Sequence, residues 1–427
     1  MAAPSAYSVG AWLSPERRPL TVLLSTNFLS LVSNQLTALA VPWFVLVLTG
    51  SATKMGITAA ATLLPAVVMT FLGGAIADRT NERRMSAFAD VLSGVTVALV
   101  PLLYVLGYLN FPILLALMVA GAVFDTPGNS ARAKLTPKLA ERGGVEIERV
   151  TSLQGAFNAI SSLFGAILAG VLISTLGATN VLWINAAAFA ISAVTMFTLI
   201  PEMHIKREVV PSVVEDIRIG LRYVRENSLV SALIVTALVI NGLLAPFMAV
   251  LLPYLAKTEW DSATRYGLMV SGFGAGALVG SIAVGVLTER IGRSIIVRIS
   301  IILLTLPVFA FVAIPDIVIA WISAVLMGVG MGMVNPLISA LMYRVTAPEI
   351  LGRVHGVIGA GAMIASPLGI ILISPFLEQF GLATSFLLIA ISLTVFAGWL
   401  FLFSPFLREV EAVSSSLSAT EPGEAIT

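Results

Sequence analysis

Long apolar runs alternate along this chain with short segments that carry most of its charge. A helix needs about 20 mostly apolar residues to cross a bilayer. Runs of that length, bounded by charges and by Gly or Pro, predict twelve transmembrane helices. Their expected bounds are 20–48, 55–77, 85–106, 111–131, 151–175, 180–200, 229–256, 266–288, 294–314, 317–343, 354–377 and 382–405.

The longest polar stretch between these runs is 201–228. Within it Val214, Ile217, Leu221 and Val224 recur at helical spacing among charged residues, which predicts a short amphipathic helix at the inner membrane surface. We expect a linker between two halves, with a partner-binding helix as the alternative.

The predicted fold is an all-α membrane protein with twelve transmembrane helices in two six-helix pseudo-repeats. The tail is rich in Ser, Glu and Ala and is expected to be disordered. The expected parts are a cytoplasmic N-terminal segment 1–19, a six-helix bundle 20–200, the linker 201–228, a second bundle 229–405 and a cytoplasmic tail 406–427.

The two halves repeat one another in sequence. The segment 42–79 matches 253–290 at a constant offset of 211 without gaps, and Pro137 and Pro348 keep that offset. In transporters built from such repeats, the substrate site lies near the bilayer midplane between the halves, and one half rocks against the other.

Composition supports a membrane protein, since 58% of the 427 residues are hydrophobic and 11% are charged. About a quarter of the residues are charged in an average soluble domain. The chain has no cysteine and only two histidines, His204 and His355, so we expect no metal and no cofactor. The net charge of +1 gives no reason to expect nucleic acid. No phosphate loop and no nucleophile with a base is recognised, so an enzyme is not expected.

Basic residues are distributed unevenly between the two predicted membrane faces. Of 24 Lys and Arg, only Lys54, Lys257 and Arg265 fall on the face opposite the termini, which leaves 21 on the other. By the positive-inside rule, both termini are then cytoplasmic.

The inner ends of the second and eighth predicted helices carry two copies of one motif. Its residues are Gly74, Asp78, Arg79, Arg83 and Arg84 in the first copy and Gly285, Glu289, Arg290, Gly292 and Arg293 in the second. Both copies resemble the G-x-x-x-[DE]-R-x-G-[RK] gate signature of the major facilitator superfamily. The glycine allows close helix approach, the acid can meet a helix N-terminus, and the arginines can anchor at the anionic inner leaflet.

Further motifs resemble the drug-exporter branch of this superfamily that contains macrolide efflux proteins and the enterobactin exporter. They are Gly272–Gly276, Asn335-Pro336, Pro348-Glu349, Gly352–Val354 and Pro367–Gly369. The resemblance implies a proton-coupled exporter in a bacterial cytoplasmic membrane.

The chain differs from that branch at two places. The fifth helix has Gly165-Ala166 where antiporters of the superfamily carry Gly-Pro. The first gate motif has Asn81-Glu82 where Gly-Arg is usual.

Few acidic residues lie within the predicted spans. A charge at the bilayer centre costs about 2.5–3.5 kcal/mol on insertion scales, so each is a functional candidate. Asp125 is the best single candidate for a proton site, with Asp90 and Arg132 as further coupling candidates. The sequence favours, ahead of this, a latch in which both aspartates pair with Arg83, Arg84 or Arg132 and hold the inner gate shut.

In this superfamily the first, fourth, seventh and tenth helices line the cavity, which makes Asn34, Gln35, Asn241 and Asn335 the candidate substrate contacts. Hydrogen bonding between helices is the alternative for each. An apolar cavity with amide groups suits bulky neutral or weakly cationic molecules.

We therefore expect a monomeric secondary transporter that exports lipophilic or amphipathic small molecules, of the multidrug and antibiotic efflux type, by proton antiport. Its expected partners are the small-molecule substrate, protons and the lipid bilayer. The alternatives are an exporter of a specific metabolite, such as a siderophore or a lipid-like compound, and a gradient-independent lipid scramblase.

Overall fold

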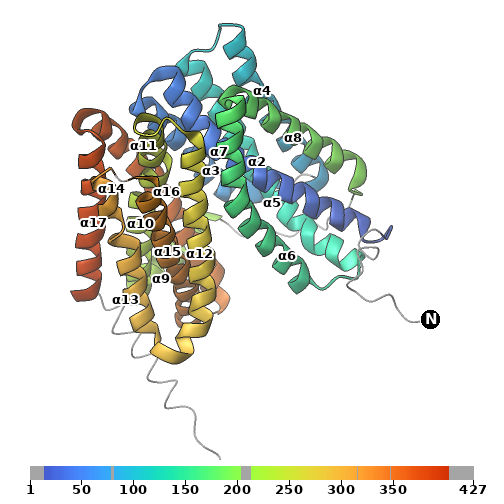
Figure 1. The fold of residues 1–427 in the computed structure, drawn as a ribbon. Coiled ribbons are helices and arrows are strands. Elements are labelled where there is room, and N and C mark those ends of the chain that lie inside the picture. Colours follow the sequence, from blue (N-terminus) through green and yellow to red (C-terminus); the bar gives the residue numbers. More distant parts are fainter. Residues whose placement is uncertain (1–13, 78–80, 203–212, 315, 347, 403–427) are drawn as a thin grey trace, which may run out of the picture. The chain divides into compact units, whose positions relative to one another are not determined.

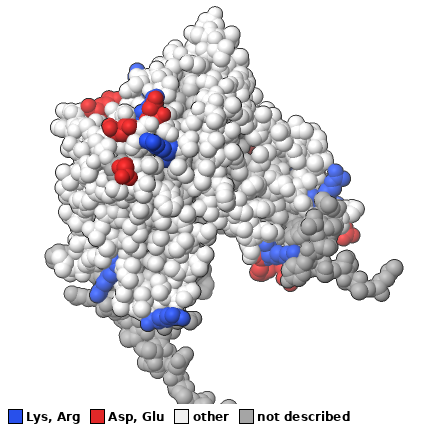
Figure 2. Space-filling model, in the orientation of Figure 1, with Lys and Arg blue, Asp and Glu red and all other residues white. Residues whose placement is uncertain are grey.

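A computed structural model describes residues 14–77, 81–202, 213–314, 316–346 and 348–402 (Figure 1). Over these ranges every regular element is a helix, and twelve helical segments are long and apolar enough to cross a membrane, as the sequence predicts. The expected tail 406–427 and most of the expected segment 1–19 lie outside these ranges. On the face shown in Figure 2, the charged side chains lie in a few small groups, and wide areas of the surface carry no charge.

The chain divides into two compact units, Met1–Val210 with Trp260–Gly267, and Pro211–Glu259 with Leu268–Thr427. Six membrane-spanning segments make up the first unit. They are α2 (Arg18–Thr49), α3 (Ala52–Ala77), α4 (Glu82–Val105), α5 (Phe111–Arg142), the run of α6 (Ile147–Ile160), η1 (Ser161–Gly165) and α7 (Ala166–Leu176), and α8 (Ala178–Leu199).

The second unit begins with the short helix α9 (Val213–Glu226). This helix packs against α10 (Ser228–Pro246) and α16 (Pro348–Phe380). The spans are α10 (Ser228–Pro246) with η2 (Phe247–Leu251) and α11 (Leu252–Thr258), α12 (Ala263–Ile291), α13 (Arg293–Thr305) with α14 (Val308–Val312), α15 (Ile317–Val345), α16 (Pro348–Phe380) and α17 (Leu382–Leu402).

In the first unit α4 packs between α5 and α8, and α2 contacts α3, α8 and the α6–η1–α7 span. A core cluster joins these helices through buried side chains such as Leu23, Ala87, Leu139 and Met196. This packing brings α2, α4, α5 and α8 together, and polar residues that they carry meet inside the unit.

In the second unit three fully buried rings join η2, α14 and α17. Phe247, Phe311 and Phe386 have pairwise centroid distances of 5.1, 5.6 and 5.3 Å. Aromatic pairs at this spacing add stability beyond the area that they bury. A larger apolar cluster joins α10, α13, α15, α16 and α17.

Glycines bring α12 and α15 into direct backbone contact. A Cβ added to Gly276 or to Gly328 would lie 2.0 Å from the carbonyl oxygen of Val325 or of Phe273. Small residues at such contacts let transmembrane helices approach closely, where van der Waals packing is the main attraction.

Two local features differ from the predicted elements. The fourth helix was expected to end at 131, but α5 continues to Arg142, because Arg132, Leu135, Thr136 and Leu139 form a buried face beyond the apolar run. In addition, two spans contain π-turns, η1 and η2, which hydrophobic periodicity does not reveal.

The glycine contact between α12 and α15 gives a matched pair of substitutions on one helix. Gly276→Ala forces the two backbones apart and should lower the free energy of unfolding by about 1–3 kcal/mol, as overpacking does. Gly285→Ala should be neutral, because no described atom lies within 4 Å of the added Cβ. Thermal unfolding of the purified variants in detergent measures the difference, and equal stability of the two would contradict the assigned contact.

Candidate functional site

A guanidinium group lies in the interior of the first unit. Arg132 is held by α5, and its side chain is 5% exposed. Its Nε donates to Ser86 Oγ on α4 at 2.9 Å, and its Nη1 donates to Ser30 Oγ on α2 at 2.6 Å. Three helices are therefore joined through one side chain.

The counter-charge of this group is Asp90, which lies one turn after Ser86 on α4. Both carboxylate oxygens of Asp90 accept from Arg132 Nη2. Ser192 on α8 donates to Asp90 Oδ2 at 2.5 Å and also accepts from Arg132 Nη2 at 3.2 Å. A buried ion pair is tolerated when further hydrogen bonds satisfy its remaining polar atoms, and the serines meet that requirement here.

We call Ser30, Ser86, Asp90, Arg132 and Ser192 the arginine cluster. Of these residues, only Asp90 and Arg132 were candidates from the sequence. Ser86 and Asp90 stand four residues apart on one helix, and this spacing indicates from the sequence that they share a helix face. Nothing in the local sequence around Ser30 or Ser192 indicates that they reach Arg132.

Asp125, the candidate proton site, lies on α5 outside the arginine cluster. It is partly exposed, and its Oδ2 accepts from Asn129 Nδ2 at 3.2 Å. Within the described ranges it forms no ion pair. The structure thus brings Asp90 and Arg132 together and leaves Asp125 with an amide partner.

The residues of the first gate motif that the structure describes tie elements of the first unit together. Arg83 contacts Glu202 Oε1 at 2.9 Å, donates to the carbonyl oxygen of Ile200 at 3.0 Å and covers the ring of Phe197. The more exposed Arg84 reaches the same Glu202 at 3.1 Å. These arginines hold the start of α4 to the chain after α8. Gly74 lies in α3, and Asp78 and Arg79 lie outside the described residues.

The departure at Asn81-Glu82 has a structural basis. Asn81 caps α4 by accepting from the backbone N–H groups of Arg83 and Arg84. Glu82 is buried and accepts from Lys138 Nζ on α5 at 2.7 Å. A second ion pair thus joins α4 to α5 beyond the arginine cluster.

In the second gate motif, Gly292 separates α12 from α13. It has a φ of +75°, in the region that L side chains rarely adopt, which explains a glycine at this tight connection. Arg290 is exposed at the end of α12, and Arg293 begins α13. Glu289 lies in the last turn of α12. No close contact is found for Gly285 among the described atoms, so the expected helix approach is not seen there.

The four substrate candidates are divided between the units. On α2, Asn34 is exposed and Gln35 is half-buried. In the second unit Asn335 is exposed on α15, and Asn241 donates to the carbonyl oxygen of Ala237 on its own helix at 2.8 Å. No hydrogen bond of the Asn34, Gln35 or Asn335 side chains is found among the described residues.

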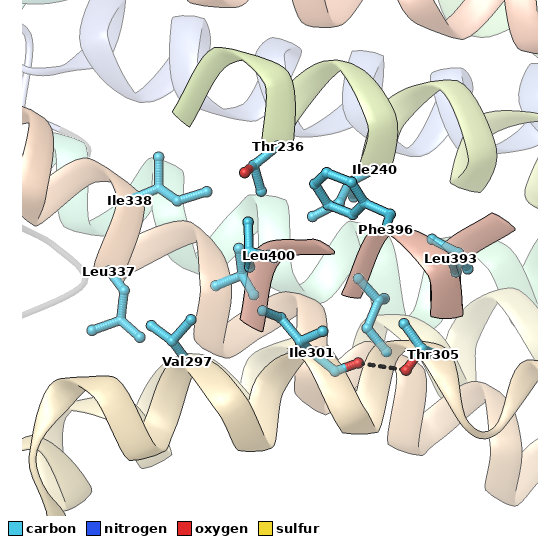
Figure 3. Close-up of a pocket in the computed structure, with 12 residues that line it drawn as sticks. Thr236, Ile240, Val297, Ile301, Thr305, Leu337, Ile338, Leu393, Phe396 and Leu400 are labelled. Atoms are coloured by element: carbon cyan, nitrogen blue, oxygen red, sulfur yellow. Dashed lines mark hydrogen bonds between the residues drawn. The ribbon is translucent and has the colours of Figure 1, made fainter. Parts of the chain in front are cut away.

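The second unit has an apolar cavity at the place that corresponds to the arginine cluster (Figure 3). Val297 and Ile301 line it and stand 211 positions after Ser86 and Asp90, which is the offset of the sequence repeat. Ile338 on α15 also lines it. The second unit therefore has apolar side chains at the positions that the repeat makes equivalent to Ser86 and Asp90.

The architecture is that of known membrane transporters. A solved structure of the nucleoside transporter NupG matches this chain with a TM-score of 0.77 over 92% of this chain and 99% of that one, at 14% identity. Twelve spanning helices in two six-helix repeats define the major facilitator class, as the sequence indicates.

Residues 13–422 match the family model described as transmembrane secretion effector, and the chain belongs to this family of the major facilitator superfamily. It is 31% identical to the multidrug efflux pump Tap of Mycolicibacterium fortuitum over 93% of this chain and 98% of that protein. It is 23% identical to macrolide efflux protein A of Streptococcus pyogenes, over 84% of this chain and 89% of that protein. It is 28% identical to the enterobactin exporter EntS of Salmonella typhimurium, over 77% of this chain and 78% of that protein. The expected branch is confirmed, and this chain is a multi-pass membrane transporter.

The arginine cluster predicts a non-additive effect on stability. Arg132→Ile leaves the Asp90 carboxylate buried and unpaired and should lower the free energy of unfolding by about 3–5 kcal/mol. The double variant Asp90→Ile with Arg132→Ile removes both charges and should recover most of that loss. Chemical unfolding in detergent, followed by tryptophan fluorescence, measures both. As a control, Arg84→Ala removes a surface pair and should change stability by about 1 kcal/mol at most. If the double variant is no more stable than Arg132→Ile, the unpaired Asp90 carboxylate is not the cause of the lost stability.

Proposed function

We propose that this protein exports lipophilic or amphipathic small molecules from the cytoplasm by proton antiport, with alternating access through its two units. The observation that carries this proposal is the state of the carboxylates in α4 and α5. Asp90 is buried and forms an ion pair with Arg132. Asp125 is partly exposed, and its hydrogen-bond partner is the side-chain amide of Asn129.

This difference favours Asp125 over Asp90 as the residue that binds and releases the coupled proton. A coupling carboxylate must exchange protons with water during each cycle. Protonation of Asp90 would leave the Arg132 charge buried without a counter-ion, at a cost of several kcal/mol. Asp125 forms no ion pair within the described ranges, so its protonation does not leave a bound cation without its counter-ion.

The substrate class follows from the spans and from the relatives. The candidate contacts Asn34, Gln35, Asn241 and Asn335 are uncharged amides, which suit neutral or weakly cationic molecules. The similarity to the multidrug efflux pump Tap and to macrolide efflux protein A supports antibiotic efflux as the role of this chain. The enterobactin exporter supports a second candidate, export of one native metabolite such as a siderophore.

The first test is gradient-driven transport by Asp125→Asn in proteoliposomes, with a panel of dyes, antibiotics and siderophores. The amide keeps the contact with Asn129 but cannot bind the proton. We expect uphill transport to fall at least tenfold while exchange of labelled for unlabelled substrate without a gradient persists. Full gradient-driven transport by this variant would exclude Asp125 as the proton site. Wild-type lipid movement that continues after the gradient is collapsed would instead support a scramblase.

The expected orientation supplies a second test. With 21 of 24 basic residues on the side of the termini, both termini should be cytoplasmic. Green fluorescent protein fused after Thr427 should fluoresce in a bacterial host, and alkaline phosphatase fused there should be inactive. The same phosphatase inserted at Lys54 should be active, and the reverse pattern would overturn this orientation.

A further inference from the structure

Asp125 and Asn129 stand one helical turn apart on α5 and form a polar pair. Asn129 Nδ2 donates to Asp125 Oδ2 at 3.2 Å, and no other hydrogen bond of either side chain is found within the described part of the chain. Asn129 is exposed and Asp125 is partly exposed. Ionisable side chains in membrane spans face the bundle interior or a water-filled cavity rather than lipid. The pair is therefore placed where both a proton and a ligand can reach it.

The packing of α5 against α4 sets the direction of this pair. A Cβ added to Gly128 would lie 2.6 Å from Ala89 Cβ. One added to Gly121 would lie 2.8 Å from Thr96 Oγ1. The two glycines stand seven residues apart and so share the face of α5 that meets α4. Asn129 follows Gly128 directly and therefore points about 100° away from that contact. The close contact of the two helices keeps the amide on the accessible side of α5.

The charges that act on the Asp125 carboxyl are those of Arg132 on α5 and Asp90 on α4, which are paired with each other. The remaining ionisable residues of α4 and those of α2, α3 and α6, the other helices that pack against α5, are confined to first turns. They are Glu82, Arg83, Arg84, Arg18, Lys54, Glu148 and Arg149. Arg132 is already bound within the arginine cluster. Among the described residues, the hydrogen-bond partner of Asp125 is therefore a neutral amide.

An amide can pair with either protonation state of a carboxyl group, but in opposite directions. The carboxylate accepts from the Nδ2 group of Asn129, which leaves Asn129 Oδ1 to accept from a ligand. The neutral acid needs an acceptor for its O–H, and Oδ1 supplies it after the amide turns over about its terminal torsion. The Nδ2 group then takes the accessible place. A proton bound by Asp125 thus reverses the hydrogen-bonding character that Asn129 offers.

We propose that Asn129 is a proton-controlled switch for substrate recognition. With Asp125 ionised it accepts a hydrogen bond from the substrate, and with Asp125 protonated it presents a donor instead. The ligand class is a lipophilic molecule, neutral or cationic, that carries an N–H or O–H donor. Such a molecule loses its hydrogen bond when the proton binds, and this competition gives the exchange that antiport needs. The proposal rests on the proposed export function and identifies the side chain that carries the competition.

The test compares two permanent cations, ethidium, whose amino groups donate hydrogen bonds, and tetraphenylphosphonium, which has no hydrogen-bonding group. Equilibrium dialysis against the purified protein gives both affinities at about pH 4.5 and about pH 8.5, a range in which carboxyl groups in proteins titrate. As the pH rises, the affinity of the wild type should increase about fivefold more for ethidium than for tetraphenylphosphonium, the size expected for one hydrogen bond. The carboxylate charge attracts both cations, so the ratio of the two increases isolates the hydrogen bond.

Substitutions of Asn129 separate the switch from a structural role. In Asn129→Leu the two increases should agree within twofold, while binding of tetraphenylphosphonium shows that the variant is folded. Asn129→Gln keeps an amide one turn from Asp125 and should retain a difference greater than twofold. Asn180→Leu, which removes an exposed amide on α8, should keep the full difference. An unchanged difference in Asn129→Leu overturns the proposal, as does a wild type that binds neither cation or gains affinity equally for both.

The switch and the proposed function fail separately. If Asp125→Asn abolishes gradient-driven transport while Asn129→Leu keeps the difference between the cations, the proposed function stands and the switch is wrong. If Asp125→Asn keeps full gradient-driven transport, Asp125 is not the proton site, whatever the two cations show.

Discussion

A cation inside a membrane protein must be satisfied by the protein itself, and Arg132 imposes that constraint on the first unit. Its five N–H donors require acceptors from neighbouring helices, because lipid supplies none. Ser30, Ser86, Asp90 and Ser192 supply them from α2, α4 and α8. The depth and rotation of four helices are therefore linked, and a shift of any one of them would leave a buried polar atom unpaired.

The second unit reaches the same six-helix architecture by different means. Its backbones approach at Gly276 and Gly328, and three phenylalanines fill the region of η2, α14 and α17. At the position that the repeat makes equivalent to Asp90, it has Ile301, which lines an apolar cavity. Van der Waals packing has little orientational requirement, so these contacts restrict helix rotation less than the hydrogen bonds of Arg132 do.

The proposed proton site connects to the arginine cluster through α5. This helix carries both Arg132 and Asp125, so proton binding would occur on an element whose position the arginine cluster fixes. The same cluster holds α2, α4 and α8 against α5.

The amino-acid sequence by itself determined the twelve spans, the repeat and the family, because apolar length and short motifs are local properties read directly along the chain. It also singled out Asp90, Asp125 and Arg132, since charges are rare in the spans. Only the tertiary structure decided that Arg132 pairs with Asp90 while Asp125 does not, and that Gln35 packs against Gly165. Partner choice depends on how far each helix is rotated and how deeply it is set, and packing between residues distant in sequence determines both.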